Sequence, residues 1–96
     1  MEFEWDEHKA AANFAKHGIS FELAMQVFAD PMRIIGDDTR KDYGELRQNT
    51  VGRADADIIA CVTHTDRAGV TRLISARHAS RKERKTYYGQ DNQNDA

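Results

Sequence analysis

The sequence has little of what secreted, membrane-bound and disulfide-linked proteins need. It contains one cysteine, Cys61, which can form no internal disulfide and has no second thiol for a cysteine zinc site. No stretch approaches the roughly 18 consecutive apolar residues of a membrane-spanning helix. Residues 1–6 are acidic, whereas a secretory signal peptide begins with basic and then apolar residues. We therefore expect a cytoplasmic protein that makes no contact with a membrane.

Motifs for metal-dependent or nucleophilic catalysis are also missing. The histidines are not spaced closely enough in sequence to suggest a metal-binding motif; they are His8, His17, His64 and His78. The acidic pair at 37–38 falls in an ordinary polar stretch. There is no serine elbow and no glycine-rich phosphate loop. The sequence therefore predicts neither a bound metal nor a cofactor.

The charges are distributed unevenly along the chain. The whole sequence of 96 residues has a net charge of −2, but residues 61–96 carry seven Lys/Arg against four Asp/Glu. All seven basic residues of that half lie between Arg67 and Lys85, and residues 66–85 contain only two acidic ones. Such a segment creates a local positive field that can attract a polyanion, although a solvated helix face has the same composition.

Hydrophobic periodicity and capping residues predict the elements of the first third. These elements are a strand over 3–5, a helix over 7–17 and a second helix over 21–28. Asp6 and Ser20 stand at the N-cap positions, and Gly18 and Pro31 follow the two helices as stop signals. The first helix has one expected apolar stripe, formed by Ala10, Ala11, Phe14 and Ala15.

The remaining chain predicts a sheet followed by a basic helix. The expected elements are a short strand over 32–35, a loop over 36–42, a weak edge strand over 45–51, a central strand over 58–63, a strand over 70–76 and a helix over 81–88. Ser80 and Glu83 form a capping box, Gly89 ends the helix, and 90–96 is expected to be disordered. The order predicts one α+β domain over 1–89, in which helices cover one face of an antiparallel sheet of three to four strands beside the N-terminal strand.

Guanidinium, imidazole and phenol side chains are the remaining candidates for chemistry. Simple strand alternation places Arg72 on the face opposite Arg77, and Arg81, Arg84 and Tyr88 share one side of the last helix. Arginine binds phosphate through two parallel hydrogen bonds, and tyrosine can stack on a base or donate a proton. RNA can be cut without a metal ion because its 2′-hydroxyl is an internal nucleophile. The alternatives are that Tyr87 and Tyr88 anchor the core and that His17 caps a helix.

The combined pattern resembles the BrnT family of toxins over residues 3–88. The segments that carry this resemblance are Phe3-Glu4-Trp5-Asp6, Lys9-Ala10-Ala11-Ala12-Asn13, Lys16-His17-Gly18-Ile19-Ser20-Phe21-Glu22, Ala24, Val27-Phe28, Asp30-Pro31, Asp42-Tyr43-Gly44-Glu45, Arg47, Gly52, Val62, His64-Thr65, Arg72, Ile74-Ser75-Ala76-Arg77, Arg81, Glu83-Arg84 and Tyr87. The resemblance implies a fold like that of RelE-type ribonucleases and an endoribonuclease that blocks growth or translation. It also implies a BrnA-like antitoxin that covers the basic region and, as a pair with the toxin, represses its own promoter.

The resemblance further implies roles for particular residues. Arg77 is the leading candidate for stabilising the phosphate, with Arg72 and Arg47 as weaker cationic candidates. His17 and His64 are possible proton carriers, and Tyr87 is a possible stacking or acid group. The expected RNA-binding residues are Arg47, Arg81, Lys82, Arg84, Lys85 and Tyr88. Residues 48–50 are polar where relatives have an apolar strand, so we expect that strand, and with it Arg47, to be poorly held.

Two other functions fit the same sequence. The chain can be a module that binds RNA or a protein without cutting, because loss of catalysis need not change the fold. A DNA-binding repressor is the second, but no helix–turn–helix pair precedes a basic recognition helix in the required order. An adjacent gene for a small basic partner favours the toxin over both.

Overall fold

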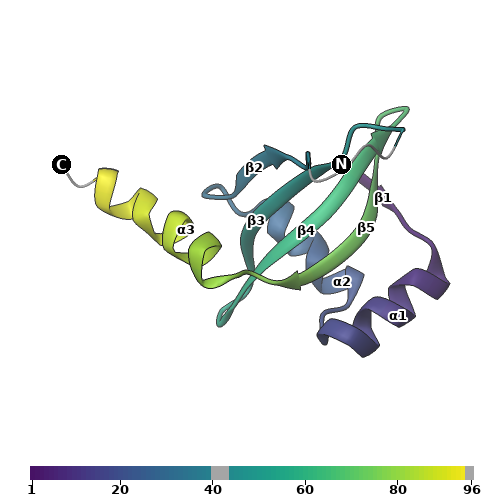
Figure 1. Ribbon diagram of the computed structural model, residues 1–96, viewed down its shortest axis with the longest axis horizontal. Coiled ribbons are helices and arrows are strands. Elements are labelled where there is room, and N and C mark those ends of the chain that lie inside the picture. Colours follow the sequence, from purple (N-terminus) through teal and green to yellow (C-terminus); the bar gives the residue numbers. More distant parts are fainter. Residues whose placement is uncertain (40–43, 95–96) are drawn as a thin grey trace.

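The computed structural model describes residues 1–39 and 44–94. Their elements are β1 (Glu2–Glu4), α1 (Glu7–His17), α2 (Phe21–Ala24), the 3₁₀ helix η1 (Met25–Ala29), β2 (Ile34–Asp37), β3 (Gln48–Asp55), β4 (Ile58–Arg67), β5 (Val70–His78) and α3 (Arg81–Asn94). The strands form one sheet in the order β1-β5-β4-β3-β2 (Figure 1). The α+β fold is confirmed, and the sheet is mixed because β1 joins β5 in parallel while β2 to β5 are antiparallel. Residues 40–42 of the expected loop lie outside the described residues.

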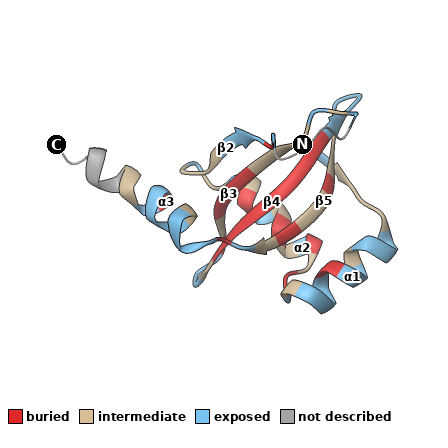
Figure 2. Ribbon diagram, in the orientation of Figure 1, coloured by how far each residue is buried: buried red, intermediate tan, exposed pale blue. Residues whose placement is uncertain are grey.

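The helices α1, α2 and η1 cover one face of the sheet and enclose the larger core. Its buried members are Ile19, Phe21, Ala24, Val27, Ala54, Ala60, Val62, Leu73 and Ala76. Burial is concentrated in β3 and β4, β5 is mainly half-buried, and most of residues 81–90 in α3 are exposed (Figure 2). A smaller cluster lies on the other face, where Tyr87 of α3 packs with Val51, Ile59 and Cys61. The opposite face of the sheet therefore has a helix at only one end.

The capping residues of the first two helices are confirmed, but the buried side of α1 is not the expected one. The Asp6 carboxylate accepts from the Lys9 N–H at 3.0 Å, and Gly18 ends α1 with φ +74°. The side chain of Phe14 is 56% exposed, and Asn13 is the buried residue of the helix. The expected stripe is wrong because the face that meets the sheet includes a polar residue.

The strand β3 is stronger than its composition suggests. The expected edge strand is instead paired on both sides, with β2 and with β4. Its polar side chains are satisfied across the sheet, because the Thr63 hydroxyl donates to Asn49 at 2.7 Å and Thr50 lies 2.7 Å from Nε2 of His64. Hydrogen-bonded polar groups can be buried at little cost, so the expected fraying does not occur.

Two helix ends also differ from expectation. The segment expected as one helix over 21–28 changes after Ala24 into η1, which lies close against β3: a Cβ on Gly52 would stand 2.9 Å from Cγ1 of Val27. At the other end of the chain, α3 continues past Gly89 to Asn94. The Gln90 side chain donates to the Met32 carbonyl at 2.8 Å, and this tie offsets the cost of about 1 kcal/mol for a glycine within a helix. Residues 95 and 96 of the expected tail lie outside the described residues.

Candidate active site

A β-bulge in the β4–β5 ladder decides which arginines share a face. The register shifts between Thr63 and His64, so Arg72 pairs with Thr65 and Arg77 pairs with Cys61. Side chains alternate along a strand, so Cys61 and Thr65 of β4 point to the same side of the sheet. Directly opposed residues of antiparallel strands also point to the same side. Arg72 and Arg77 therefore lie on one face, and the expectation from simple alternation is wrong because the bulge adds a residue.

This face lies opposite α1, α2 and η1 and carries mainly polar side chains. We call it the polar face, and its strand residues are Asn49, Thr63, Thr65, Arg72, Ser75 and Arg77. We include Arg47, which directly precedes β3 and lines the same pocket as Arg72. The paired strands β3, β4 and β5 fix the backbone positions of all of these residues except Arg47. The polar face is thus a rigid platform with arginines toward both of its ends.

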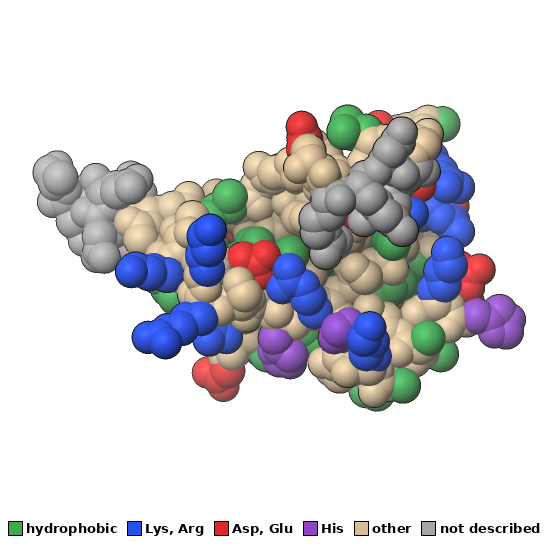
Figure 3. Space-filling view, viewed as in Figure 1, with side chains coloured by type: hydrophobic (Ala, Val, Ile, Leu, Met, Phe, Trp, Pro, Cys, Tyr) green, Lys and Arg blue, Asp and Glu red, His purple; other side chains and the backbone are tan. Residues whose placement is uncertain are grey.

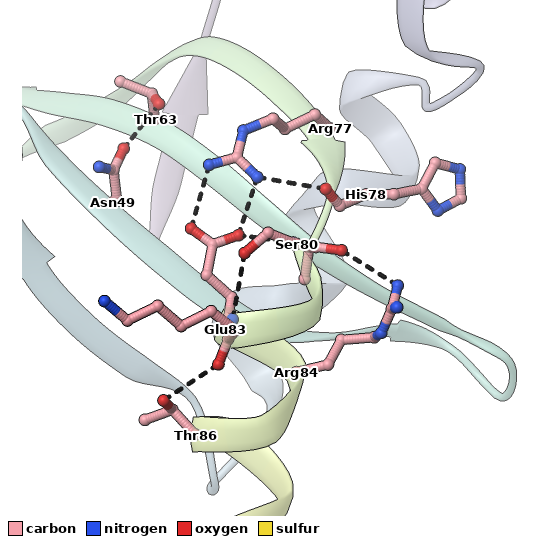
Figure 4. A network of polar contacts seen from close by, with 10 residues as sticks. Asn49, Thr63, Arg77, His78, Ser80, Glu83, Arg84 and Thr86 are labelled. Carbon is pink, nitrogen blue, oxygen red and sulfur yellow. Dashed lines mark hydrogen bonds and ion pairs between the residues drawn. The ribbon is translucent and has the colours of Figure 1, made fainter.

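Arg77 is held at the end of β5 by Glu83 of α3 (Figure 4). Its Nη1 and Nη2 donate to the two carboxylate oxygens at 2.8 and 3.0 Å, and Nη1 also donates to the His78 carbonyl at 3.2 Å. The Arg77 side chain is 37% exposed. A guanidinium fixed in this way remains accessible while its orientation is set by two parallel hydrogen bonds.

Glu83 also completes the capping box at the start of α3. Its carboxylate accepts from the Ser80 N–H at 2.8 Å, and its own N–H donates to the Ser80 hydroxyl at 3.1 Å. The hydrogen bonds from Arg77, together with that from Ser80, lower the pKa of Glu83 to about 2 despite partial burial. The capping box is confirmed. The ion pair between its glutamate, Glu83, and Arg77 was not predicted from the sequence.

Cations meet carboxylates at the other end of the polar face. Arg72 pairs with Glu4 at 3.2 Å, and Glu45 bridges Arg67 at 3.3 Å and Arg47 at 3.6 Å. A small pocket of about 40 Å³ lies here, lined by Asp6, Lys9, Glu45, Arg47, Arg67, Arg72, Leu73 and Ile74. Arg47 and Arg72 are therefore brought together, and both are more than two-thirds buried.

The basic side chains of α3 form a second positive surface beside the polar face. Figure 3 shows Lys and Arg gathered over α3, apart from another group at the end of the sheet near β1 and the β4–β5 turn. The exposed basic residues of α3 are Arg81, Lys82, Arg84 and Lys85. Arg84 also donates to the Ala79 carbonyl at 3.1 Å, which ties it to the first turn. These residues can contact a polyanion that lies along the helix.

His64, one of the two expected proton carriers, lies away from the polar face. His64 is buried on the helix-covered side, where it meets the edge of Phe28 at 4.9 Å between ring centres and the Thr50 hydroxyl at 2.7 Å. Burial lowers the pKa of His64, so the ring is neutral in the folded protein near pH 7. His17 occupies the last turn of α1, in the helical layer. The structure thus separates His64 from the arginines of the polar face.

The pKa of His64 predicts a loss of stability in mild acid. In the unfolded chain the ring binds a proton below about pH 6.5, whereas the folded protein resists protonation, so the free energy of unfolding should fall as pH drops below that value. Urea unfolding at pH 7.5 and pH 5 measures this fall. It should shrink in His64→Gln and persist in the exposed-site control His78→Gln. An unchanged pH dependence in His64→Gln would contradict the assignment.

The two tyrosines have different environments. Tyr87 is buried, and its hydroxyl donates to the Asp30 carboxylate at 2.5 Å. Burial and this hydrogen bond raise the pKa of Tyr87. Burial alone would raise the pKa of Asp30 too, but the hydrogen bonds from Tyr87 and from the Arg53 and Met32 N–H groups outweigh it and lower that pKa. Tyr87 therefore anchors α3 to the body, whereas Tyr88 is 46% exposed with Arg53 over its ring.

Asn13 is a second residue that sequence reasoning missed. Its side chain donates to the Ala76 carbonyl at 2.8 Å and to the Ile19 carbonyl at 3.1 Å, and accepts from the Ala76 N–H at 3.0 Å. The parallel partner β1 pairs with β5 only as far as Arg72, so the amide of Asn13 takes the place of a neighbouring strand at Ala76. It fixes the backbone one residue before Arg77. The sequence signal that could have indicated this role is a single asparagine between apolar residues of a predicted helix.

Within residues 1–39 and 44–94, no three His, Cys, Asp or Glu side chains come together as metal ligands would. No helix in the described segments is both long enough and apolar enough to cross a membrane.

Comparison with known proteins gives two similarities. A family model described as the ribonuclease toxin BrnT of type II toxin–antitoxin systems matches residues 5–83. The crystal structure of the ribonuclease toxin BrnT from Brucella abortus is similar at a TM-score of 0.67 and 29% identity, covering 84% of this chain and 99% of that one. No curated protein matches.

Proposed function

The chain belongs to the BrnT family of ribonuclease toxins of type II toxin–antitoxin systems, and from that premise we propose that it cuts RNA at the polar face without a metal ion. The observation that carries this proposal is that the bulge in β5 brings Arg72 and Arg77 onto one face, where Arg47 lines a pocket beside Arg72. Each guanidinium group can bind a phosphate through two parallel hydrogen bonds.

The proposed reaction is attack of the 2′-oxygen on the adjacent phosphorus. The P–O2′ bond forms, the P–O5′ bond breaks, the 2′-hydroxyl proton leaves to a base, and the departing 5′-oxygen receives a proton. Negative charge grows on the non-bridging oxygens, and Arg77 stabilises it because its guanidinium is already oriented. Arg72 and Arg47 lie at the other end of the polar face, so in this proposal they and the basic residues of α3 hold the flanking RNA.

The proposal assigns His64 and Tyr87 to the core and gives neither a chemical step. His64 faces the helical layer, and Tyr87 already donates to Asp30. Among the described side chains beside the strand arginines, the proton acceptors are carboxylates such as Glu4 and Glu45. Catalysis in this proposal therefore depends mainly on charge stabilisation by arginine.

Cleavage should persist in excess EDTA and leave 2′,3′-cyclic phosphate or 3′-phosphate ends. The reason is that the 2′-hydroxyl supplies the nucleophile and arginine the positive charge, so no step needs a metal-bound water. End-group analysis of RNA fragments made by the purified protein measures this outcome. Loss of activity in EDTA with recovery in Mg²⁺ or Zn²⁺ would overturn the mechanism.

Expression of the chain alone should slow growth, and co-expression of the adjacent antitoxin should restore it. The antitoxin is proposed to be BrnA-like, to cover the basic surface, and to bring the pair to promoter DNA in the cytoplasm. Growth curves with verified accumulation of folded protein measure the effect. Normal growth under those conditions would count against an active toxin.

A non-catalytic RNA-binding or protein-binding module is the second candidate. The observation in its favour is that Arg72 and Arg77 are each paired with a carboxylate. Such pairing lowers the net positive charge available to a transition state. The two candidates separate when RNA binding and cleavage are measured on the same oligonucleotide, because the module binds without producing fragments.

A further inference from the structure

The ion pair between Arg77 and Glu83 is the most tightly built polar contact at the end of the polar face. Both terminal nitrogens of the guanidinium, Nη1 and Nη2, and both carboxylate oxygens take part, at 2.8 and 3.0 Å. Paired parallel hydrogen bonds of this kind fix the plane of the guanidinium as well as its distance. An arginine without such a partner samples many rotamers, and ordering it on binding has an entropic cost.

Glu83 is itself fixed from two directions. Its carboxylate accepts from the Ser80 N–H, and its backbone N–H donates to the Ser80 hydroxyl, so it is built into the first turn of α3 (Figure 4). The positive end of the helix also favours a carboxylate at this position. Because its pKa is about 2, Glu83 stays ionised at any pH in the neutral range.

We propose that Glu83 is a positioning residue for RNA cleavage, which holds the guanidinium of Arg77 where the phosphate must meet it. The inference rests on the proposed function and adds to it a link between the first turn of α3 and the reacting centre. Glu83 does not touch the RNA in this account. It acts through Arg77 alone.

The same contact has a contrary interpretation, in which Glu83 competes with phosphate for Arg77. The two interpretations predict opposite results when the charge of Glu83 is removed. A competitor must be displaced by RNA, so its removal lowers KM. A positioning residue leaves KM near its original value and lowers kcat, because a displaced group costs transition-state stabilisation.

Glu83→Gln is the test because glutamine can still accept from Ser80 and from Arg77 but lacks the charge. We expect kcat to fall about 10- to 100-fold with KM unchanged. In an Arg77→Ala background the same substitution should have no further effect, since Glu83 acts only through that side chain. A lowered KM with unchanged kcat, or an equal loss in both backgrounds, would overturn the proposal.

A matched control separates positioning from stability of the helix. Ser80→Ala removes the hydroxyl half of the capping box but keeps the Ser80 N–H and the ion pair, so it should weaken α3 and leave kcat close to wild type. If Ser80→Ala lowers kcat as much as Glu83→Gln, the effect comes from the helix and the proposal is wrong. Should Glu83→Gln fail to fold, Glu83→Asp keeps the charge, shortens the side chain and should still lower kcat.

A measurement without cleavage keeps this inference distinct from the proposed function. In wild-type protein, the two-point pair should slow rotation of the Arg77 guanidinium and give separate NMR signals for its Nη protons. Those signals should average in Glu83→Gln. Averaged signals already in the wild type would overturn the inference, whereas absence of cleavage with separate signals would overturn only the proposed function.

Discussion

Arg77→Ala should lower the rate of RNA cleavage by at least about 100-fold while leaving the fold intact. A cation that stabilises transition-state charge is typically worth this much or more. The substitution leaves Glu83 with its Ser80 hydrogen bond and with access to water, so the loss of stability should stay below about 1 kcal/mol. Single-turnover cleavage and urea unfolding of the same preparation measure the two quantities.

Two further variants sharpen the result for Arg77. Arg77→Lys keeps the charge but lacks the two-pronged guanidinium, so it should recover little of the lost rate. Lys82→Ala, on the exposed surface of α3, should instead weaken RNA binding modestly and reduce its salt dependence by about one charge. Near wild-type cleavage by folded Arg77→Ala would remove this arginine from the site.

Asn13→Ala should lower the free energy of unfolding by about 3 kcal/mol. The substitution leaves the Ala76 N–H, the Ala76 carbonyl and the Ile19 carbonyl without their side-chain partner in a buried position. Each unsatisfied buried group costs about 1 to 3 kcal/mol. Water can partly reach these three groups, so we expect about 1 kcal/mol for each of them. The midpoint of thermal unfolding should fall on the order of 15 °C.

Variants at Asn13 can separate hydrogen bonding from packing. Asn13→Asp keeps the size but turns an acceptor toward the two carbonyls, so it should be at least as destabilising as Asn13→Ala. Gln26→Ala removes an exposed amide from η1 and should change stability by no more than about 0.5 kcal/mol. A loss of that small size in Asn13→Ala would show that β5 does not depend on this amide.

Local signals were predictable from the sequence because neighbouring residues produce them. Asp6, Ser20 and the Ser80–Glu83 box each satisfy backbone groups within three residues, and all of these caps are present. The strands β4 and β5 were predictable for the same reason. The α+β class followed from the order of these elements.

The predictions that were wrong concern features set by contacts between residues far apart in the sequence. Asn13 is 63 residues from Ala76, and nothing near it in sequence indicates that a helix amide will complete a strand edge. The bulge in β5 is set by its pairing with β4, so alternation alone placed Arg72 on the wrong face. His64 and Tyr87 have residue types that suit catalysis, but their partners Thr50 and Asp30 hold them inside the fold.

The most direct test of the account is an NMR titration with a 2′-O-methyl RNA oligonucleotide, which lacks the nucleophile and so binds without being cut. The account predicts that backbone signals change over residues 47–49, 63–65, 72–77 and 81–85, which include the polar face and the basic start of α3. Changes confined to α1, α2 and η1 would contradict it, because that layer covers the opposite face of the sheet.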